Sequence, residues 1–350
     1  MICLMSGNFV QRGEHAILDK HTRAKHALQA GADAVLELPT VFATSNAELF
    51  AKGAVHILSS IPSVKTLCFG AENADKTAFK LAAKYLNNEP KEVSERIKKA
   101  VANGASYAKA RAQGFAGFVP LDLLCSPNNI LGLEYTRAIE SIQADLDILP
   151  IERKGAGYTN EKMQENYSSA SAIRLAIQNG DTVSGNVPDC VLNDLPTTSP
   201  LSNLEILEKY AILSRPAEEI ARVCDCTEGL ENALKRAALD NKPLVESLTS
   251  ARYTSSRIQR IALQNLLHID KRLITNSLRS SLYLRVLAIK KERSDLLSAF
   301  SKSAFPLIIR AHDEDDLQGI TKECFEKDRF AEKVYSLLSP TKQQEVNKFL

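Results

Sequence analysis

The chain of 350 residues is long enough for two domains of ordinary size, and its composition, 44% hydrophobic and 25% charged, is that of a globular protein without wholesale disorder. No run approaches 18 uninterrupted apolar residues, and the N-terminus has neither a basic region nor a long apolar segment, which excludes a membrane span and argues against a secretory signal. The seven cysteines include no C-x-x-C pair, which disfavours a disulfide framework and a zinc ribbon, and a reducing cytoplasm is the expected compartment.

Strand-like and helix-like segments alternate over the first 180 residues. Short apolar runs that end at small residues, glycine or proline predict strands at 2–5, 34–38, 64–69 and 146–150. Amphipathic spacing and capping residues predict helices at 20–30, 45–59, 76–87, 91–102, 126–142 and 168–180. This alternation predicts an α/β fold with a doubly wound parallel sheet, in which ligands bind beyond the carboxyl ends of the strands.

The second half of the chain has a different character. Three prolines interrupt the stretch 184–204, which we interpret as a linker. After it, leucine periodicity predicts helices to the end of the chain. The expected organisation is therefore an α/β domain over 1–183, a linker over 184–204 and an α-helical domain over 205–350.

The overall net charge of +2 conceals a basic stretch at 252–293. This stretch holds ten lysines and arginines against two acids, a local net charge of +8. Such a surface can neutralise phosphates, which makes nucleic acid a candidate partner. A solvated helical surface would have the same composition, so charge alone leaves both interpretations open.

Several residues after the predicted strands could bind a nucleotide. Gly70 would let a ligand approach the backbone closely, because it has no Cβ. Asn128, on the first turn of a helix, offers an amide beside free backbone N–H groups. Arg153 and Lys154 follow the fourth strand, where the phosphates of a bound nucleotide would lie. Each has an ordinary alternative: a turn glycine, a helix cap and a pair of surface cations.

A phosphate cradle is also expected at the start of the helix 168–180. Ser171 and Arg174 share a face of this helix, and its N-terminal amides add donors. A capped helix with a solvent-facing arginine is the alternative. The six histidines form no metal-ligand set, and the chain has no P-loop, G-x-G-x-x-G or G-x-S-x-G motif. We therefore predict no structural or catalytic metal, and no catalytic residue is assigned.

Taken together, several long strings resemble the bacterial tRNA(Met) cytidine acetate ligases. In chain order they are MSGNFVQRGEHAILDKHTRAKHAL, GADAVLELP, FGAEN, GASY, SPNNILGLEY, SASAIR and RYTSSRIQR. The resemblance implies a nucleotidyltransferase-type, HIGH-type Rossmann-like α/β domain followed by a helical domain. It also implies that ATP activates acetate as acetyl-adenylate, and that the acetyl group passes to the wobble cytidine of elongator tRNA(Met) to give N4-acetylcytidine.

The resemblance further implies roles for individual residues. Gly70, Asn128 and Arg153 fall on ATP-contacting positions of the family, and Lys154, Ser171 and Arg174 are added as further ATP contacts. ATP is expected as a substrate, with Mg²⁺, and the other partners are acetate and elongator tRNA(Met), with no membrane and no obligate protein partner. The cations expected to contact tRNA are Arg252, Arg257, Arg260, Lys271 and Arg272.

The family's H-x-G-H motif, which grips the ATP phosphates, occurs nowhere in this chain. The family pattern therefore predicts that a strand and its histidine loop, about 30 residues, precede residue 1. A downstream Met taken as the start of a longer gene is favoured over a decaying gene and over a persistent short form. Two other functions stay open: a non-catalytic tRNA-binding protein, and a small-molecule adenylyltransferase of the same fold, against which the basic helical part argues.

Overall fold

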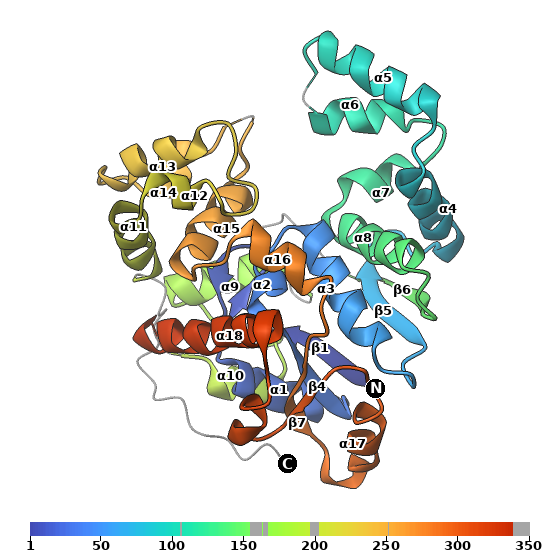
Figure 1. Cartoon of the computed structure of the whole chain (residues 1–350), viewed down its shortest axis with the longest axis vertical. Helices are drawn as coiled ribbons and strands as arrows, with labels where there is room; N and C mark the ends of the chain where they lie inside the picture. Colours follow the sequence, from blue (N-terminus) through green and yellow to red (C-terminus); the bar gives the residue numbers. More distant parts are fainter. Residues whose placement is uncertain (106, 155–162, 164–166, 197–202, 251, 339–350) are drawn as a thin grey trace. The chain divides into compact units, whose positions relative to one another are not determined.

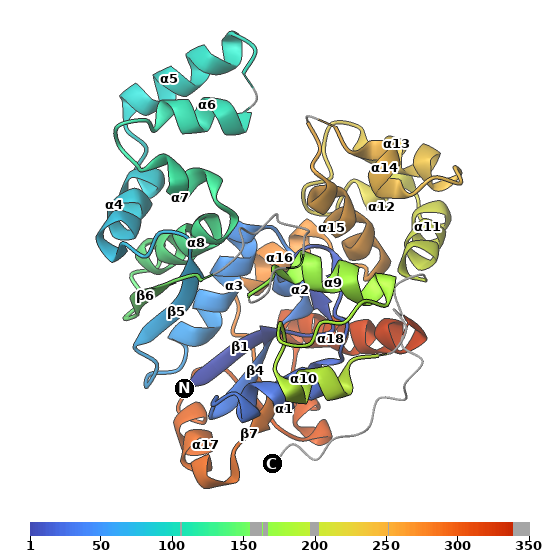
Figure 2. The ribbon, with the colours of Figure 1, turned by 180° about the vertical axis from the view of Figure 1, so that it is seen from behind.

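The computed structural model describes residues 1–105, 107–154, 163, 167–196, 203–250 and 252–338, and it has a mixed α/β architecture (Figures 1 and 2). The chain divides into two compact units. Unit 1 is formed by Met1–Ile61 and Arg174–Leu350, and unit 2 by Pro62–Ile173. These units differ from the organisation expected from the sequence, because the chain leaves unit 1 after residue 61 and later returns to it.

Unit 1 is built on a four-stranded sheet with the order β1-β4-β7-β8. Strand β1 (Ile2–Ser6) pairs in parallel with β4 (Ala34–Leu38), with Ile2 opposite Ala34 and Ser6 opposite Leu38. Every residue of β4 is buried, whereas every residue of β1 is only half-buried. Within the described residues β1 pairs on one side only, so it is an edge strand of this sheet.

The second half of the chain supplies the rest of this sheet. Strand β7 (Leu284–Ile289) runs antiparallel to β4, and β8 (Leu307–Ile308) pairs in parallel with β7. All six residues of β7 are buried. The expectation of helices to the end of the chain is therefore wrong at these strands: LRVLAI is a central strand that pairs with β4 and β8 and is buried on both faces of the sheet.

Helix α1 (Lys20–Gln29) packs on β4 and β7, and α10 (Asp189–Asp194) lies beside it. The contact with the sheet is an apolar cluster that includes Ala24, Leu28, Val35 and Leu287. Imidazole Nε2 of His26 lies 2.7 Å from a carboxylate oxygen of Asp194, which ties α10 to α1. The expected linker 184–204 thus contains a helix, while its residues 197–202 lie outside the described residues.

The remaining helices of unit 1 surround this sheet or form a helical cluster. Helices α2 (Thr40–Ala43) and α16 (Lys271–Ser277) pack against the long α18 (Gly319–Leu338). A separate apolar cluster joins the segments between Ile212 and Ala262. Its helices are α11 (Leu204–Ser214), α12 (Ala217–Ile220), α13 (Leu230–Ala238), α14 (Leu244–Leu248) and α15 (Ser255–Leu266). The other elements are α3 (Ala47–Ser59), α17 (Asp295–Phe300), the short strands β2 (Phe9–Val10) and β3 (Glu14–His15), and the 3₁₀ turns Lys291–Arg293 and Ala311–Glu314.

Unit 2 is a smaller α/β unit. Its strands β5 (Thr66–Ala71) and β6 (Asp147–Glu152) run parallel, and α4 (Lys76–Asn87) and α8 (Pro127–Ser141) pack on them and on each other. A Cβ added to Gly132 of α8 would lie 2.3 Å from the ring of Phe69, so glycine permits the close approach of helix and strand. The unit also contains α5 (Lys91–Ala102), α6 (Tyr107–Gly114) and α7 (Leu121–Cys125).

The strands and helices predicted for the first half are confirmed. Helix α1 begins where expected, because the Asp19 side chain accepts hydrogen bonds from the backbone N–H groups of His21 and Thr22. The predicted helix 168–180 is α9 (Ala170–Asn179), in which Ser169 Oγ accepts from the N–H of Ala172. The four predicted strands, expected in a single sheet, lie in two: 2–5 and 34–38 in the four-stranded sheet of unit 1, and 64–69 and 146–150 in the two-stranded sheet of unit 2.

Candidate functional site

The loop that follows β1 lies at the carboxyl end of the parallel β1–β4 pair, where ligands bind in folds of this class. A Cβ added to Gly7 would lie 2.3 Å from Glu37 Oε1, so the loop can pass over this carboxylate only because residue 7 is glycine. Asn8 Oδ1 accepts from the backbone N–H of Lys20 at 2.8 Å. Arg23 donates to the carbonyls of Ser6, at 3.0 Å, and of Gly7. These hydrogen bonds fix the loop to α1, the helix that carries Lys20 and Arg23.

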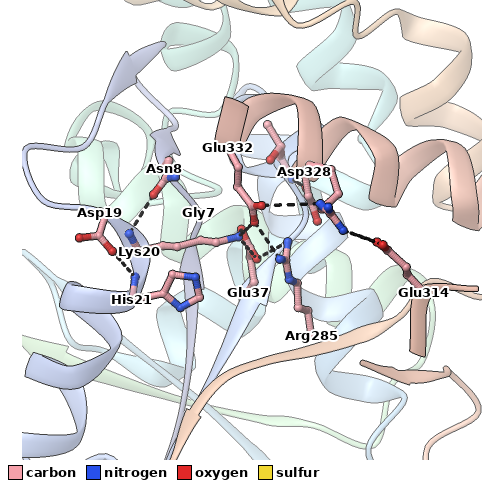
Figure 3. A network of polar contacts seen from close by, with 12 residues as sticks. Gly7, Asn8, Asp19, Lys20, His21, Glu37, Arg285, Glu314, Asp328 and Glu332 are labelled. Carbon is pink, nitrogen blue, oxygen red and sulfur yellow. Dashed lines mark hydrogen bonds and ion pairs between the residues drawn. The ribbon is translucent and has the colours of Figure 1, made fainter. Parts of the chain in front are cut away.

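A buried network of charges lies beneath this loop (Figure 3). Lys20, only 1% exposed, places Nζ 2.8 and 2.6 Å from the two carboxylate oxygens of Glu37, which is 2% exposed, and it also contacts Glu332. Arg285 pairs with Glu37 at 3.1 Å and with Glu332 at 2.8 Å. Two cations therefore bridge two carboxylates from four elements: α1, β4, β7 and α18.

Asp328 of α18 adds a third carboxylate to this network. It accepts from the N–H of Thr40 at 2.7 Å and from the hydroxyl of Tyr283 at 2.5 Å. Burial, together with the charge of Glu37, raises the pKa of Asp328 to about 6. Burial would also raise the pKa of Glu332, but the cations of Lys20 and Arg285 outweigh it and lower this pKa to about 2.

The sequence analysis missed this network, although one signal was available. Glu37 lies inside the apolar run AVLEL, and Arg285 lies inside LRVLAI. A charged residue within a buried strand requires an opposite charge, because an unpaired buried charge is strongly unfavourable. The signal marks the two positions, but nothing local indicates that they face one another.

In unit 2, the residues expected to contact ATP gather at the carboxyl ends of β5 and β6. Gly70 is exposed and lies opposite Ile151, and a Cβ added to it would lie 3.4 Å from Cγ of Arg153. The N–H of Arg153 donates to the carbonyl of Ala71 at 2.9 Å. The side chains of Arg153 and Lys154 are exposed. Gly70 and Arg153 are therefore direct neighbours, with an accessible cation beside an open backbone.

The N-terminus of α8 already holds a carboxylate of the protein itself. Glu72 accepts from Nδ2 of Asn128 at 2.7 Å and from the backbone N–H of Asn129 at 2.9 Å. In return, Oδ1 of the buried Asn129 accepts from the N–H groups of Glu72, at 2.8 Å, and Asn73, at 3.0 Å. The sequence predicted free amides that attract an anion here, and in this structure the anion is Glu72.

Ser171 and Arg174 lie on α9, both half-buried. Arg174 is close to two groups around the loop after β1. Burial lowers the pKa of His15 and that of Arg23, and the positive charge of Arg174 lowers both further. Nδ1 of His15 lies 3.0 Å from the carbonyl of Ala16, while its buried Nε2 has no hydrogen-bond partner among the described residues. Arg174 thus lies near Arg23 and near His15, an imidazole whose lowered pKa favours its neutral form, in unit 1.

The residues predicted to contact RNA differ in whether a carboxylate of the protein forms an ion pair with them. Arg252 pairs with Glu228 at 2.7 Å, and Arg272 pairs with Glu323 at 2.5 Å. Glu228 and Glu323 lie outside the basic stretch 252–293, so the local count of charges could not reveal these pairs, although Arg272 also lies 3.6 Å from Asp270 within the stretch. Arg285, in the same stretch, belongs to the buried network described above.

The other three predicted contacts face no carboxylate within ion-pair distance among the described residues. Arg257 donates to the carbonyl of Asp225 at 3.0 and 2.7 Å and lies over the ring of Tyr253 at 5.0 Å. Arg260 is half-buried, and burial lowers its pKa. Lys271 is exposed at the first position of α16.

No group of three or more His, Cys, Asp or Glu side chains in the described part of the chain is arranged to hold a metal ion. Within the same residues, no helix has both the length and the apolar character needed to cross a membrane.

Comparison with known proteins gives one consistent result. A family model described as "HIGH Nucleotidyl Transferase" matches residues 1–348. The chain is 35% identical to the "tRNA(Met) cytidine acetate ligase" of Caldanaerobacter subterraneus subsp. tengcongensis, over 96% of this chain and 87% of that protein. It is also 35% identical to the protein of the same name from Clostridium perfringens, over 97% and 88% of the two chains.

Solved structures agree with these sequence relatives. The crystal structure of Thermotoga maritima TmcAL in its apo form matches with a TM-score of 0.89 and 26% identity, covering all of this chain and 92% of that one. The same protein bound with alpha-thio ATP matches with a TM-score of 0.86 over the same coverage.

Proposed function

Because the chain belongs to the HIGH nucleotidyl transferase family and, within it, to the tRNA(Met) cytidine acetate ligases, we propose that it is an ATP-dependent ligase that acetylates the wobble cytidine of elongator tRNA(Met). The observation that carries this proposal is the 35% identity to ligases of that name over 96% of this chain. The match to a TmcAL structure with a bound ATP analogue supports ATP as the nucleotide.

The proposed reaction has two steps. A carboxylate oxygen of acetate attacks the α-phosphorus of ATP, the bond to pyrophosphate breaks, and acetyl-adenylate forms. The N4 amine of the cytidine then attacks the acetyl carbon and loses a proton, and AMP leaves. Negative charge develops on phosphate oxygens in the first step, where cations and amide donors stabilise it. Neither step needs a covalent intermediate on the protein.

The residues of unit 2 are suited to part of this task. The open backbone at Gly70 accommodates a flat ring, and Asn128 offers an amide beside it. Arg153 and Lys154 supply charge for phosphates, and within the described residues neither has a carboxylate at ion-pair distance. We include Ser171 and Arg174 as further phosphate contacts, with ATP entering as its magnesium complex.

The test is transfer of labelled acetate into elongator tRNA(Met) by the 350-residue chain. The expected result is ATP-dependent label in the tRNA and release of AMP. If tRNA is bound without ATP breakdown, the chain is a non-catalytic tRNA-binding protein. If AMP is transferred to a small molecule without tRNA, it is an adenylyltransferase. We further propose that the protein acts in the cytoplasm without an obligate protein partner.

Arg153→Ala tests where the phosphates lie. Because this arginine is the cation nearest to Gly70, its loss should weaken ATP binding about tenfold or more, while tRNA binding stays unchanged. Equilibrium binding of ATP and of tRNA to the same variant separates the two effects. The placement is wrong if the affinity for ATP does not change.

A further inference from the structure

The charges of the basic stretch 252–293 do not by themselves locate an RNA surface. Arg252 and Arg272 each face a carboxylate, and Arg285 is buried in the network beneath the loop after β1. An exposed cation with its counter-charge in place presents a dipole, whose potential falls off faster than that of a single charge. An RNA phosphate therefore gains most from cations without such partners.

Two neighbouring cations of unit 1 meet this condition. The backbone N–H of Lys271 donates to the carbonyl of Arg222 at 2.9 Å, which brings α16 and the loop after α12 together. Both side chains are exposed. Among the described residues, neither has a carboxylate within ion-pair distance. Arg222 lies outside the stretch 252–293, so its charge was not counted in the local excess of +8.

The loop 221–226 connects this pair to two cations of α15. Lys271 is close enough to Cys224 for its charge to act on that thiol. Arg257 donates to the carbonyl of the next residue, Asp225, and the carboxylate of Asp225 acts on Arg260. Four cations therefore border one short loop that carries a single carboxylate.

The same surface reaches the loop that follows β1. The β2–β3 hairpin places Gly13, with φ of +80°, against α15. A Cβ there would lie 2.5 Å from the backbone nitrogen of Arg260 and 2.5 Å from the carbonyl carbon of Gln259. The hairpin directly follows Gly7 and Asn8 in the chain. The cations of α15 and the carboxyl end of β1 are thus joined within one unit by a tight backbone contact.

We propose that Arg222 and Lys271 bind RNA phosphates, and that the bound strand continues past Arg257 and Arg260 towards the loop after β1. This inference rests on the proposed function, which supplies RNA as the substrate. RNA is favoured over an acidic protein because the proposed function requires it and because four cations border a loop with one carboxylate, a pattern suited to a run of phosphates.

The test compares two double variants of the full chain that lose the same number of charges. Arg222→Ala with Lys271→Ala removes the unpaired cations, whereas Arg252→Ala with Arg272→Ala removes cations that face carboxylates. Binding of elongator tRNA(Met) is measured over a series of salt concentrations. The first variant should bind about tenfold more weakly, with the slope of log K against log salt reduced by about 2. The second should lose less than about twofold.

Equal losses in the two variants would overturn the proposal, because only total charge would then matter. Unchanged RNA binding in the first variant would also overturn it and would leave the surface to a protein partner. ATP–pyrophosphate exchange with acetate, measured without tRNA, should be equal in both variants and the wild type. If the wild type shows no exchange and no acetyl transfer, the proposed function fails, while the comparison of RNA binding still decides the role of Arg222 and Lys271.

Discussion

Replacing Lys20 with methionine is the sharpest test of the buried network. Methionine has nearly the length of lysine but no charge, so Arg285, at 3.1 Å, would be the one ion-pair partner left to Glu37 among the described residues. Removing one partner of a buried ion pair costs about 3–5 kcal/mol, because the other charge stays buried. For a chain of this size that corresponds to a fall in melting temperature of roughly 4–7 °C. The chain has no tryptophan, so circular dichroism is the suitable signal for unfolding.

The same substitution at Lys52 is the matched control. Lys52 pairs with Glu48 at 2.5 Å, but both side chains are more than 40% exposed, and exposed pairs contribute about 0–1 kcal/mol. Our reasoning would be refuted if Lys20→Met lowered the free energy of unfolding no more than Lys52→Met. Adding Glu37→Gln to Lys20→Met should cost less than the sum of the single changes, because it removes the buried carboxylate that has lost one of its two cations.

Three further changes probe single contacts. Since the pKa of Asp328 is raised to about 6, the folded chain takes up a proton near pH 6 that the unfolded chain takes up only near 4. Asp328 alone therefore contributes stability that grows as the pH falls from 7 to 5, by up to about 1.4 kcal/mol per unit, and the difference in free energy of unfolding between the wild type and Asp328→Asn should show this pH dependence. Gly132→Ala would press a methyl group into the ring of Phe69, and thermal unfolding should show a loss of about 1–3 kcal/mol. Gly13→Ala should cost at least as much in the same assay, because the obstacle there is backbone of α15 and φ is positive.

The sequence predicted those parts of the fold that local signals determine. The strand at residues 2–5 and the helix after Asp19 were correctly placed, because an apolar run and a capping carboxylate act within a few residues. Strand β7 was missed, since its pairing with β4 joins positions about 250 residues apart and its arginine suggested a surface. Glu37 and Arg285 come to lie opposite each other only when β4 and β7 pair. This pairing lets both charges lie inside buried strands.

The same distinction between local signals and long-range contacts applies to the candidate functional site. Gly70 and Arg153 were predicted at the carboxyl ends of strands in a parallel sheet, and the pairing of β5 with β6 brings them next to each other. In the sequence, Glu72 is simply a residue that follows the strand predicted at 64–69. Its role as the anion at the start of α8 depends on a contact across 57 residues. The charges of the basic stretch were correctly counted, but Glu228 and Glu323, which pair with Arg252 and Arg272, lie in other segments.

In the ATP site that we propose in unit 2, the position of Glu72 would constrain how the nucleotide lies. A carboxylate that already accepts from Asn128 and from the backbone of Asn129 repels a phosphate at the same amides. The triphosphate would therefore be directed towards Arg153 and Lys154, which are exposed beyond β6. Asn128 and the open backbone at Gly70 are left for the uncharged part of the nucleotide, where an amide and a missing Cβ favour a base or ribose over a phosphate.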